Sequence, residues 1–108
     1  MENEELNFTK RYTLQDMQDV VKGAVTEVLR LPDDEKPTVS TRLDDDLLAD
    51  SIDAVDIVME LEEKLMISIA DKEAAQVHHM TIGEIAELCH RTYYGGDRPD
   101  NGNGDIDK

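Results

Sequence analysis

Residues 47–65 read LLADSIDAVDIVMELEEKL, and this stretch decides the fold of the chain. Its apolar side chains recur every three or four positions, which is the spacing of one face of an α-helix. They are Ile52, Val55, Val58, Met59, Leu61 and Leu65. Asp50 is a suitable N-cap, and Asp53 places negative charge in the first turn. We therefore predict a helix over residues 51–65 with the hydroxyl of Ser51 at its N-terminus.

Two other long segments show the same helical spacing. Each begins with a threonine three positions before an acidic residue, which is typical of a capping box. The pairs are Thr13 with Asp16 and Thr81 with Glu84. Pro32 ends the first helix, because the residue before a proline avoids helical geometry. We predict helices over residues 13–31 and 81–93; the inward side chains of the second are Ile82, Ile85, Leu88 and Cys89.

The long stretch after the first helix is rich in proline and turn-forming residues. Residues 32–46 read PDDEKPTVSTRLDDD, and this composition predicts a loop. Leu43 and Leu47 are expected to pin the far end of this loop to the core.

A shorter element separates the last two long helices. Residues 66–70, MISIA, indicate a buried connector, and Asp71 is expected to cap a short helix over residues 72–77. The fold is thus predicted to be all-α: a small four-helix bundle of three longer helices and one short third helix, with a long loop between the first two helices. The expected regions are a disordered extension (1–12), the helical domain (13–93) and a disordered acidic tail (94–108).

Charge and composition limit the possible partners. The 26 Asp and Glu residues outnumber the 11 Lys and Arg residues, and the net charge of −15 disfavours binding to nucleic acid or to an anionic membrane. No apolar run approaches the length of a membrane span, and residues 1–12 lack the apolar stretch of a secretory signal. The single cysteine, Cys89, excludes an internal disulfide. We expect a monomeric cytoplasmic protein with basic protein partners.

A catalytic role is one interpretation of Ser51. A serine nucleophile requires a base within hydrogen-bond reach and usually an oxyanion site. The G-x-S-x-G elbow is missing, and the adjacent candidates His78 and His79 are expected to point apart. We therefore predict no catalytic residue.

A metal site is a second interpretation of this acidic region. A calcium loop that begins at Asp44 fails at its fifth position, which is Leu48, and at its glycine position, which is Ala49. The zinc candidates do not have ligand spacing either; they are His78, His79, Cys89 and His90. We predict no metal site.

A covalently modified serine fits the local physics better. A helix N-terminus has free N–H groups and a partial positive charge, so it stabilises a phosphate attached in its first turn. A junction between a loop and a helix also leaves the Ser51 hydroxyl exposed to a modifying enzyme.

The stretch LADSIDAVDIVMELEEKL resembles the prosthetic-group attachment segment of acyl carrier proteins, which typically reads Asp-Ser-Leu before an acidic amphipathic helix. ISIADKEAAQV resembles the connector and short third helix of that family, and TIGEIAELCHRTY its last helix. The resemblance covers roughly residues 13–93. Three positions depart from the family pattern: Leu48 stands where Gly is common, Ala70 where Pro is common, and Ile52 where Leu is more frequent.

The resemblance implies a function for the site. Ser51 matches the serine that receives 4′-phosphopantetheine from coenzyme A, and Asp50 and Ile52 match its flanking positions. In that family a phosphopantetheinyl transferase installs the arm with magnesium. The carrier, which is not an enzyme, holds acyl groups as thioesters and brings them to acyl-transferring and chain-elongating enzymes of fatty acid, specialised lipid or polyketide synthesis. The alternatives are an unloaded interaction module of the same fold and an aminoacyl or peptidyl carrier.

The acidic face of the predicted helix is the expected docking surface for partners with basic patches. Residues 41–65 contain nine acidic and two basic residues, so they contribute −7 to the net charge of −15. Such a surface speeds encounter while each exposed pair adds little affinity; the alternative is an ordinary solvated helix face. The expected docking residues are Asp53, Val55, Asp56, Met59, Glu60 and Glu63. Val55 and Met59 are either exposed apolar anchors or plain core.

An acyl chain on the arm needs space between the helices. Small and flexible side chains near the connector are candidates for lining this space, although the same side chains suit an ordinary core. They are Ile69, Ala74, Ala75 and Val77.

Overall fold

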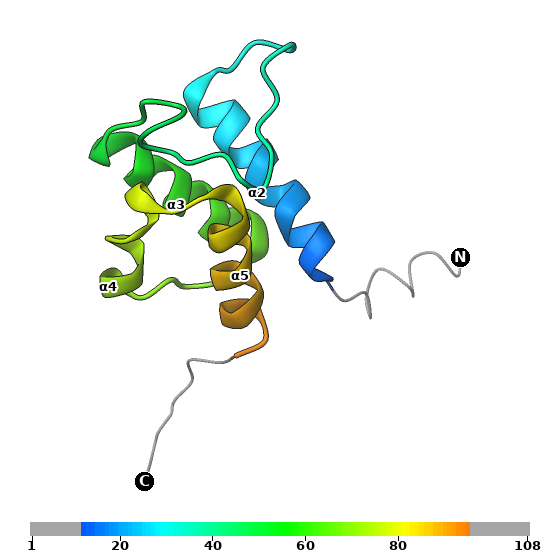
Figure 1. Ribbon diagram of the computed structural model, residues 1–108. Helices are drawn as coiled ribbons and strands as arrows, with labels where there is room; N and C mark the ends of the chain where they lie inside the picture. The colour runs from blue at the N-terminus through cyan, green and yellow to red at the C-terminus, as the bar shows by residue number, and fades with distance from the viewer. Residues whose placement is uncertain (1–11, 96–108) are drawn as a thin grey trace, which may run out of the picture.

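The computed structural model describes residues 12–95, and these residues form an all-α fold. Within them the chain forms α2 (Leu14–Leu29), α3 (Ser51–Leu65), α4 (Asp71–Ala74), the 3-10 turn η1 (Val77–His79) and α5 (Ile82–Tyr93). A long loop joins α2 to α3 (Figure 1). The predicted small helical bundle is therefore confirmed. Most of the extension (1–12) and of the tail (94–108) lies outside the described residues.

The three long helices begin with complete capping boxes, and this explains where they start. In α3 the Asp53 N–H donates to Asp50 Oδ1 at 2.9 Å, and the Asp50 N–H donates to Asp53 Oδ2 at 3.1 Å. Equivalent boxes open α2 and α5, at Thr13 with Asp16 and at Thr81 with Glu84. Each box satisfies two N–H groups that the start of a helix otherwise leaves without acceptors.

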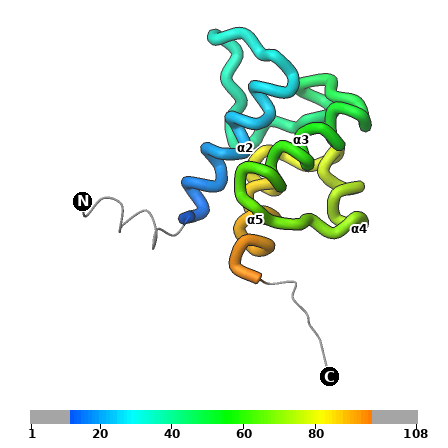
Figure 2. The backbone as a smooth tube through the Cα atoms, turned by 180° about the vertical axis from the view of Figure 1, so that it is seen from behind, coloured from blue at the N-terminus to red at the C-terminus, as the bar shows by residue number. Residues whose placement is uncertain are grey.

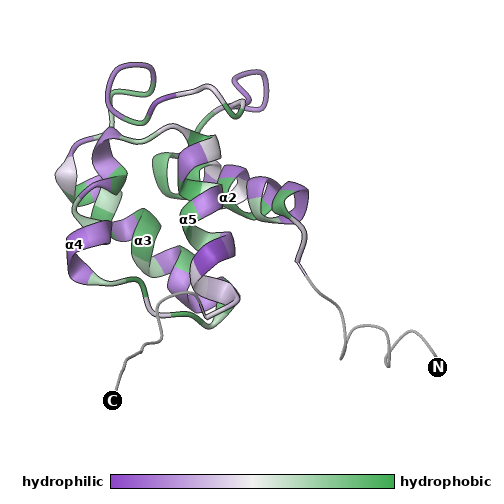
Figure 3. Cartoon of the chain, turned by 60° about the horizontal axis from the view of Figure 1, so that its bottom comes forward, coloured by the Kyte–Doolittle hydropathy of each residue, from purple (hydrophilic) through white to green (hydrophobic). Residues whose placement is uncertain are grey.

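The core lies between the inner faces of the long helices. Helix α2 packs against both α3 and α5, and Figure 2 shows the same arrangement from behind. Apolar and polar residues alternate along each helix in Figure 3, as expected for helices buried on one side. The fully buried side chains include Met17, Val21, Val25, Leu43, Ile57, Leu61, Ile82 and Ile85. Burial also raises the pKa of the Cys89 thiol to about 12, so this cysteine acts as an apolar core residue.

The ends of the described chain lie side by side. The rings of Tyr12 and Tyr93 meet edge to face with centroids 5.1 Å apart, and the Tyr94 hydroxyl donates to the Tyr12 carbonyl oxygen at 2.8 Å. The packed domain thus includes one residue beyond each end of the expected region 13–93.

The predicted third helix is wrong in its bounds and its cap. Helix α4 ends at Ala74, and the chain then turns into η1. The N-cap is Ala70, without a side-chain hydrogen bond, and Asp71 is already helical. A one-turn helix has few internal hydrogen bonds, so contacts with its neighbours decide its bounds more than local propensity does.

The first helix also ends earlier than predicted. Arg30 adopts a left-handed conformation with φ 56° and closes α2 after Leu29, two residues before the expected end. Its N–H donates to the Thr26 carbonyl oxygen, as in the C-terminal caps that glycine usually supplies.

Candidate attachment site

Ser51 is the first residue of α3, and its side chain is exposed. Within residues 12–95 its hydroxyl forms no hydrogen bond with another protein group. The capping box uses the N–H groups of Asp50 and Asp53, and the Ala54 N–H donates to the Asp50 carbonyl oxygen at 3.0 Å. Among the described residues, the Ser51 and Ile52 N–H groups beside the hydroxyl have no acceptor. A phosphate ester on Ser51 therefore fits this site without displacing any existing protein contact.

Within residues 12–95 the side chains of His78 and His79 form hydrogen bonds with the loop before Ser51 and none with Ser51 itself. His78 Nε2 donates to the Ala49 carbonyl oxygen at 2.8 Å, and His79 Nδ1 donates to Asp44 Oδ2 at 3.0 Å. The expectation that these two rings point apart is wrong, because their centroids lie 4.7 Å apart with a tilt of 39°. Both rings turn toward the same neighbouring loop, which the spacing of two adjacent residues does not reveal.

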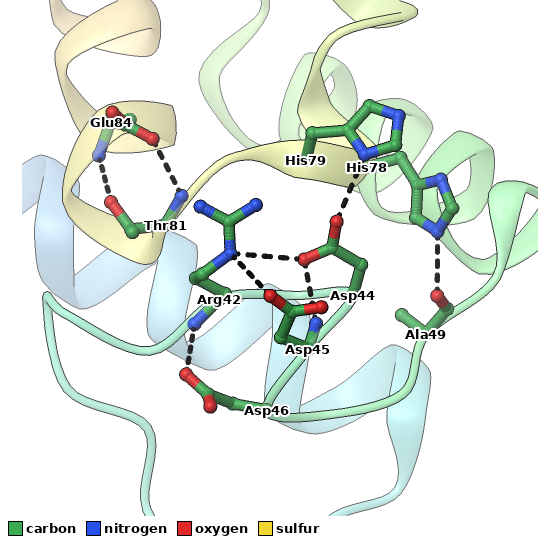
Figure 4. A network of polar contacts seen from close by, with 9 residues as sticks. All are labelled: Arg42, Asp44, Asp45, Asp46, Ala49, His78, His79, Thr81 and Glu84. Carbon is green, nitrogen blue, oxygen red and sulfur yellow. Dashed lines mark hydrogen bonds and ion pairs between the residues drawn. The ribbon is translucent and has the colours of Figure 1, made fainter.

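The loop that leads to Ser51 is held by a polar network that the sequence did not predict (Figure 4). The Arg42 N–H donates to Asp46 Oδ2 at 2.8 Å, and Arg42 Nε donates to Asp44 Oδ1 at 3.3 Å. The hydrogen bond from His79 lowers the pKa of Asp44 to about 2, with further contributions from the Asp45 N–H and from Arg42. We name residues 42–50 the attachment segment. Its contacts with η1 span 29 and 35 positions, so no local pattern indicates them.

No metal site is apparent in the part of the chain that the structure describes. Residues 12–95 contain no group of three or more His, Cys, Asp or Glu side chains arranged to hold a metal ion. The acids of the attachment segment are instead tied to Arg42, to His79 and to backbone N–H groups.

Leu48, which stands where the sequence resemblance leads us to expect glycine, has a backbone conformation that glycine adopts more readily. Its φ is 57°, in the left-handed region that costs an L-residue about 1–2 kcal/mol, and its side chain is 81% exposed. Ala70 shows the complementary case, because its φ of −60° is the value that a proline ring fixes. Glycine at position 48 and proline at position 70 would therefore both suit the backbone angles of this chain.

An exposed apolar stripe runs along α3 from Ser51. Ile52, Val55 and Met59 are 70%, 55% and 59% exposed. Their spacing places them on one helix face together with Asp56 and Glu63, which are also exposed. Val55 and Met59 are thus surface residues and not core.

The predicted docking acids differ in how freely they are presented. Asp53 is engaged in the capping box, and Glu60 Oε2 lies 3.2 Å from Lys64 Nζ. Asp56 and Glu63 have no ion pair within the described residues, so they are the acids most available to a partner.

A groove of about 390 Å³ opens beside the exposed stripe, between α3 and the connector with α4. Most of its lining is apolar, and it includes three of the four side chains expected there; Val77 is buried elsewhere. The lining residues are Val55, Val58, Met59, Glu62, Ile69, Asp71, Ala74 and Ala75. Glu62 also accepts a hydrogen bond from the Ile69 N–H at 2.8 Å, which fixes the connector against α3. A second groove, of about 420 Å³, lies between α2 and its following loop and includes no α3 residue.

Comparison with known proteins assigns the chain to a family. Residues 19–89 match the family described as phosphopantetheine attachment site. The chain is 38% identical over 79 residues to the chloroplastic acyl carrier protein 5 of Arabidopsis thaliana, covering 73% of this chain and 52% of that protein. It is 43% identical over 68 residues to chloroplastic acyl carrier protein SF2 of Brassica campestris and, equally, to a chloroplastic acyl carrier protein of Brassica napus, covering 63% of this chain and 48% of each relative.

A small helical domain that displays an exposed serine at a helix N-terminus has the architecture expected of a carrier domain. The chain belongs to the acyl carrier protein family, so the resemblance seen in the sequence is confirmed. The prosthetic group that this membership assigns is covalent 4′-phosphopantetheine. The chain spans about half the length of the curated relatives it matches. No solved structure matches it significantly.

The expected cytoplasmic location is wrong, because the curated relatives are chloroplastic and point to a plastid. The lack of a secretory-type apolar stretch does not distinguish the cytoplasm from a plastid, because organelle targeting does not depend on such a stretch. None of the helices within residues 12–95 has the length and apolar character needed to cross a membrane.

Proposed function

We propose that Ser51 carries the 4′-phosphopantetheine arm, and that the chain shuttles acyl intermediates between enzymes of fatty acid, specialised lipid or polyketide synthesis in a plastid. The observation that carries this proposal is the exposed Ser51 hydroxyl, which has no protein partner among residues 12–95 and adjoins two unpaired N–H groups. The family match and the chloroplastic relatives support it further.

The protein's contribution is to present the arm rather than to catalyse a reaction. Ser51 supplies the oxygen of the phosphoester, and the terminal thiol of the arm holds the acyl group as a thioester. Tethering raises the effective concentration of the acyl group at each enzyme that the carrier meets. The mainly apolar groove beside α3 favours an acyl chain as cargo, because apolar surface gains most from leaving water.

Partner enzymes dock on the exposed face of α3 in this proposal. Asp56 and Glu63 attract basic patches on the partner, and Ile52, Val55 and Met59 provide apolar contact close to the arm. Exposed charges increase the association rate more than the affinity, and this suits a carrier that visits several enzymes in turn. The phosphopantetheinyl transferase is the first of these partners.

Modification in vitro tests the proposal. Incubation with a phosphopantetheinyl transferase, magnesium and coenzyme A should add one arm to the protein, and Ser51→Ala should remain unmodified in the intact-mass spectrum. Ser68→Ala is the matched control, because Ser68 is also exposed but lies in the connector, and it should be modified like the unaltered chain. Absence of any shift with several transferases would indicate an unloaded interaction module.

A further inference from the structure

The position of Ser51 depends on the backbone on either side of it. Its hydroxyl has no protein partner within residues 12–95, so no contact of its own side chain fixes its orientation. The capping box of Asp50 and Asp53 fixes the helix that follows. The attachment segment, residues 42–50, fixes the approach from the other side.

Before Asp50, whose N–H belongs to the capping box, His78 makes the side-chain hydrogen bond nearest to Ser51 on that approach. Its Nε2 donates to the Ala49 carbonyl oxygen at 2.8 Å, two residues before the serine. No other side chain within residues 12–95 forms a hydrogen bond with residues 47–49. His78 is half-buried and Ala49 is only 5% exposed, so solvent competes weakly for this bond.

His79 holds the same segment at a second point. Its Nδ1 donates to Asp44 Oδ2 at 3.0 Å, so the two histidines of η1 contact the segment on both sides of Leu48 (Figure 4). Leu48 adopts φ 57°, which a leucine disfavours and which persists only when surrounding contacts hold it. The left-handed turn before Ser51 is thus flanked by two contacts from the same 3-10 turn.

We propose that His78 is a positioning residue for Ser51, and that His78 and His79 together hold the attachment segment in the conformation that the modifying transferase recognises. This inference rests on the proposed attachment of the arm at Ser51. Loss of the His78 bond frees the Ala49 carbonyl oxygen. It thereby lowers the fraction of molecules in which the attachment segment has the conformation that the transferase recognises. A partner then binds more weakly in proportion to that population, while the bound complex reacts at its former rate.

The experiment compares transferase kinetics for the unaltered chain with those for His78→Ala and His78→Gln. The glutamine amide can donate to the same carbonyl oxygen, whereas alanine cannot. We expect His78→Ala to raise KM for the carrier by about three- to tenfold, as the loss of one hydrogen bond implies, with kcat nearly unchanged. His78→Gln should restore KM. In ¹⁵N-labelled protein the Ala49 and Ser51 amide resonances should shift in His78→Ala and return toward their original positions in His78→Gln.

His90→Ala is the matched control, because His90 lies on α5 and contacts Tyr94, with ring centroids 4.9 Å apart. It should leave KM and both amide resonances unchanged. If His78→Ala fails to fold by circular dichroism, His78→Met takes its place, since methionine keeps the volume without the donor. A KM unaffected by loss of the donor, or a glutamine variant as impaired as alanine, would overturn the proposal. If the unaltered chain is never modified, the proposed function fails, and the amide resonances alone decide whether His78 holds the segment.

Discussion

Individual residues before Ser51 determine how the attachment segment is held. Leu48 bears a left-handed conformation, and Asp44 gathers hydrogen bonds from His79, from the Asp45 N–H and from Arg42. Both residues lie within ten positions of Ser51, yet within residues 12–95 neither forms a hydrogen bond with it. Both residues shape the backbone of the attachment segment, so we expect substitutions at either position to change the stability of the folded domain.

Replacing Leu48 with glycine should stabilise the domain. Glycine adopts φ 57° without a steric penalty, and the leucine side chain is 81% exposed, so little apolar burial is lost. We expect the free energy of unfolding to rise by about 0.5–1 kcal/mol in urea titrations. Leu48→Ala is the control, because it removes the side chain but keeps the Cβ atom and its strain. Equal stability of the glycine and alanine variants would contradict this explanation.

Asp44→Asn should destabilise the domain in a pH-dependent way. The hydrogen bond from His79 is the main cause that lowers the pKa of Asp44 from 3.8 to about 2. A carboxyl with a depressed pKa stabilises the folded state above its unfolded pKa, and this stabilisation is lost as the pH falls through about 2. The variant should unfold at a lower urea concentration than the unaltered chain at neutral pH, and the difference should vanish near pH 2. A difference that stayed constant over this range would assign the effect to something other than the Asp44 charge.

Helices and turns differ in how well local sequence determines them. The starts of α2, α3 and α5 follow from capping boxes and helical spacing, which are local features, and the sequence predicted all three. The bounds of α4 and η1 were not predictable, because such short elements depend on contacts with their neighbours. The same distinction applies to the site. Ser51 at the start of α3 follows from local signals, whereas the contacts of His78 and His79 arise only from tertiary packing.

The exposed face of α3 offers a test of docking. Reversing the charge of Asp56 and Glu63 with lysine should slow association with the transferase by about two- to tenfold at low salt and reduce the salt dependence of the rate. These two acids have no structural partner within residues 12–95, unlike Asp53 in its capping box, so the helix should remain intact. Stopped-flow measurements give the association rate directly.

Glu87→Lys is the matched control for this test, because Glu87 is exposed on α5 rather than α3. If Glu87→Lys slowed association as much per reversed charge as the substitutions at Asp56 and Glu63, the effect would reflect the net charge of the protein and not a defined docking face.

The net charge of −15 affects the molecule as a whole. The ion pairs between described residues lie at the surface, so they contribute little stability and do not neutralise the excess of carboxylates. The same carboxylates that attract basic partners therefore repel one another within the folded domain. The chain thus combines a small aliphatic core with a strongly acidic surface.

Magnesium ions should raise the melting temperature by about 5 °C, because cations screen this repulsion. For a domain of this size, such an increase corresponds to ~1 kcal/mol in the free energy of unfolding. Sodium chloride at the same ionic strength should produce part of the increase. Differential scanning calorimetry provides the measurement, and a melting temperature indifferent to both salts would show that carboxylate repulsion does not limit stability.

Peptide mass spectrometry of the protein isolated from its host tests the central claim most directly, because it identifies the modified residue and its cargo together. We predict that the peptide containing Ser51 carries a 4′-phosphopantetheine arm, with an acyl group as a thioester on part of the population. An unmodified Ser51 in every preparation, or an arm on another residue, would contradict the account.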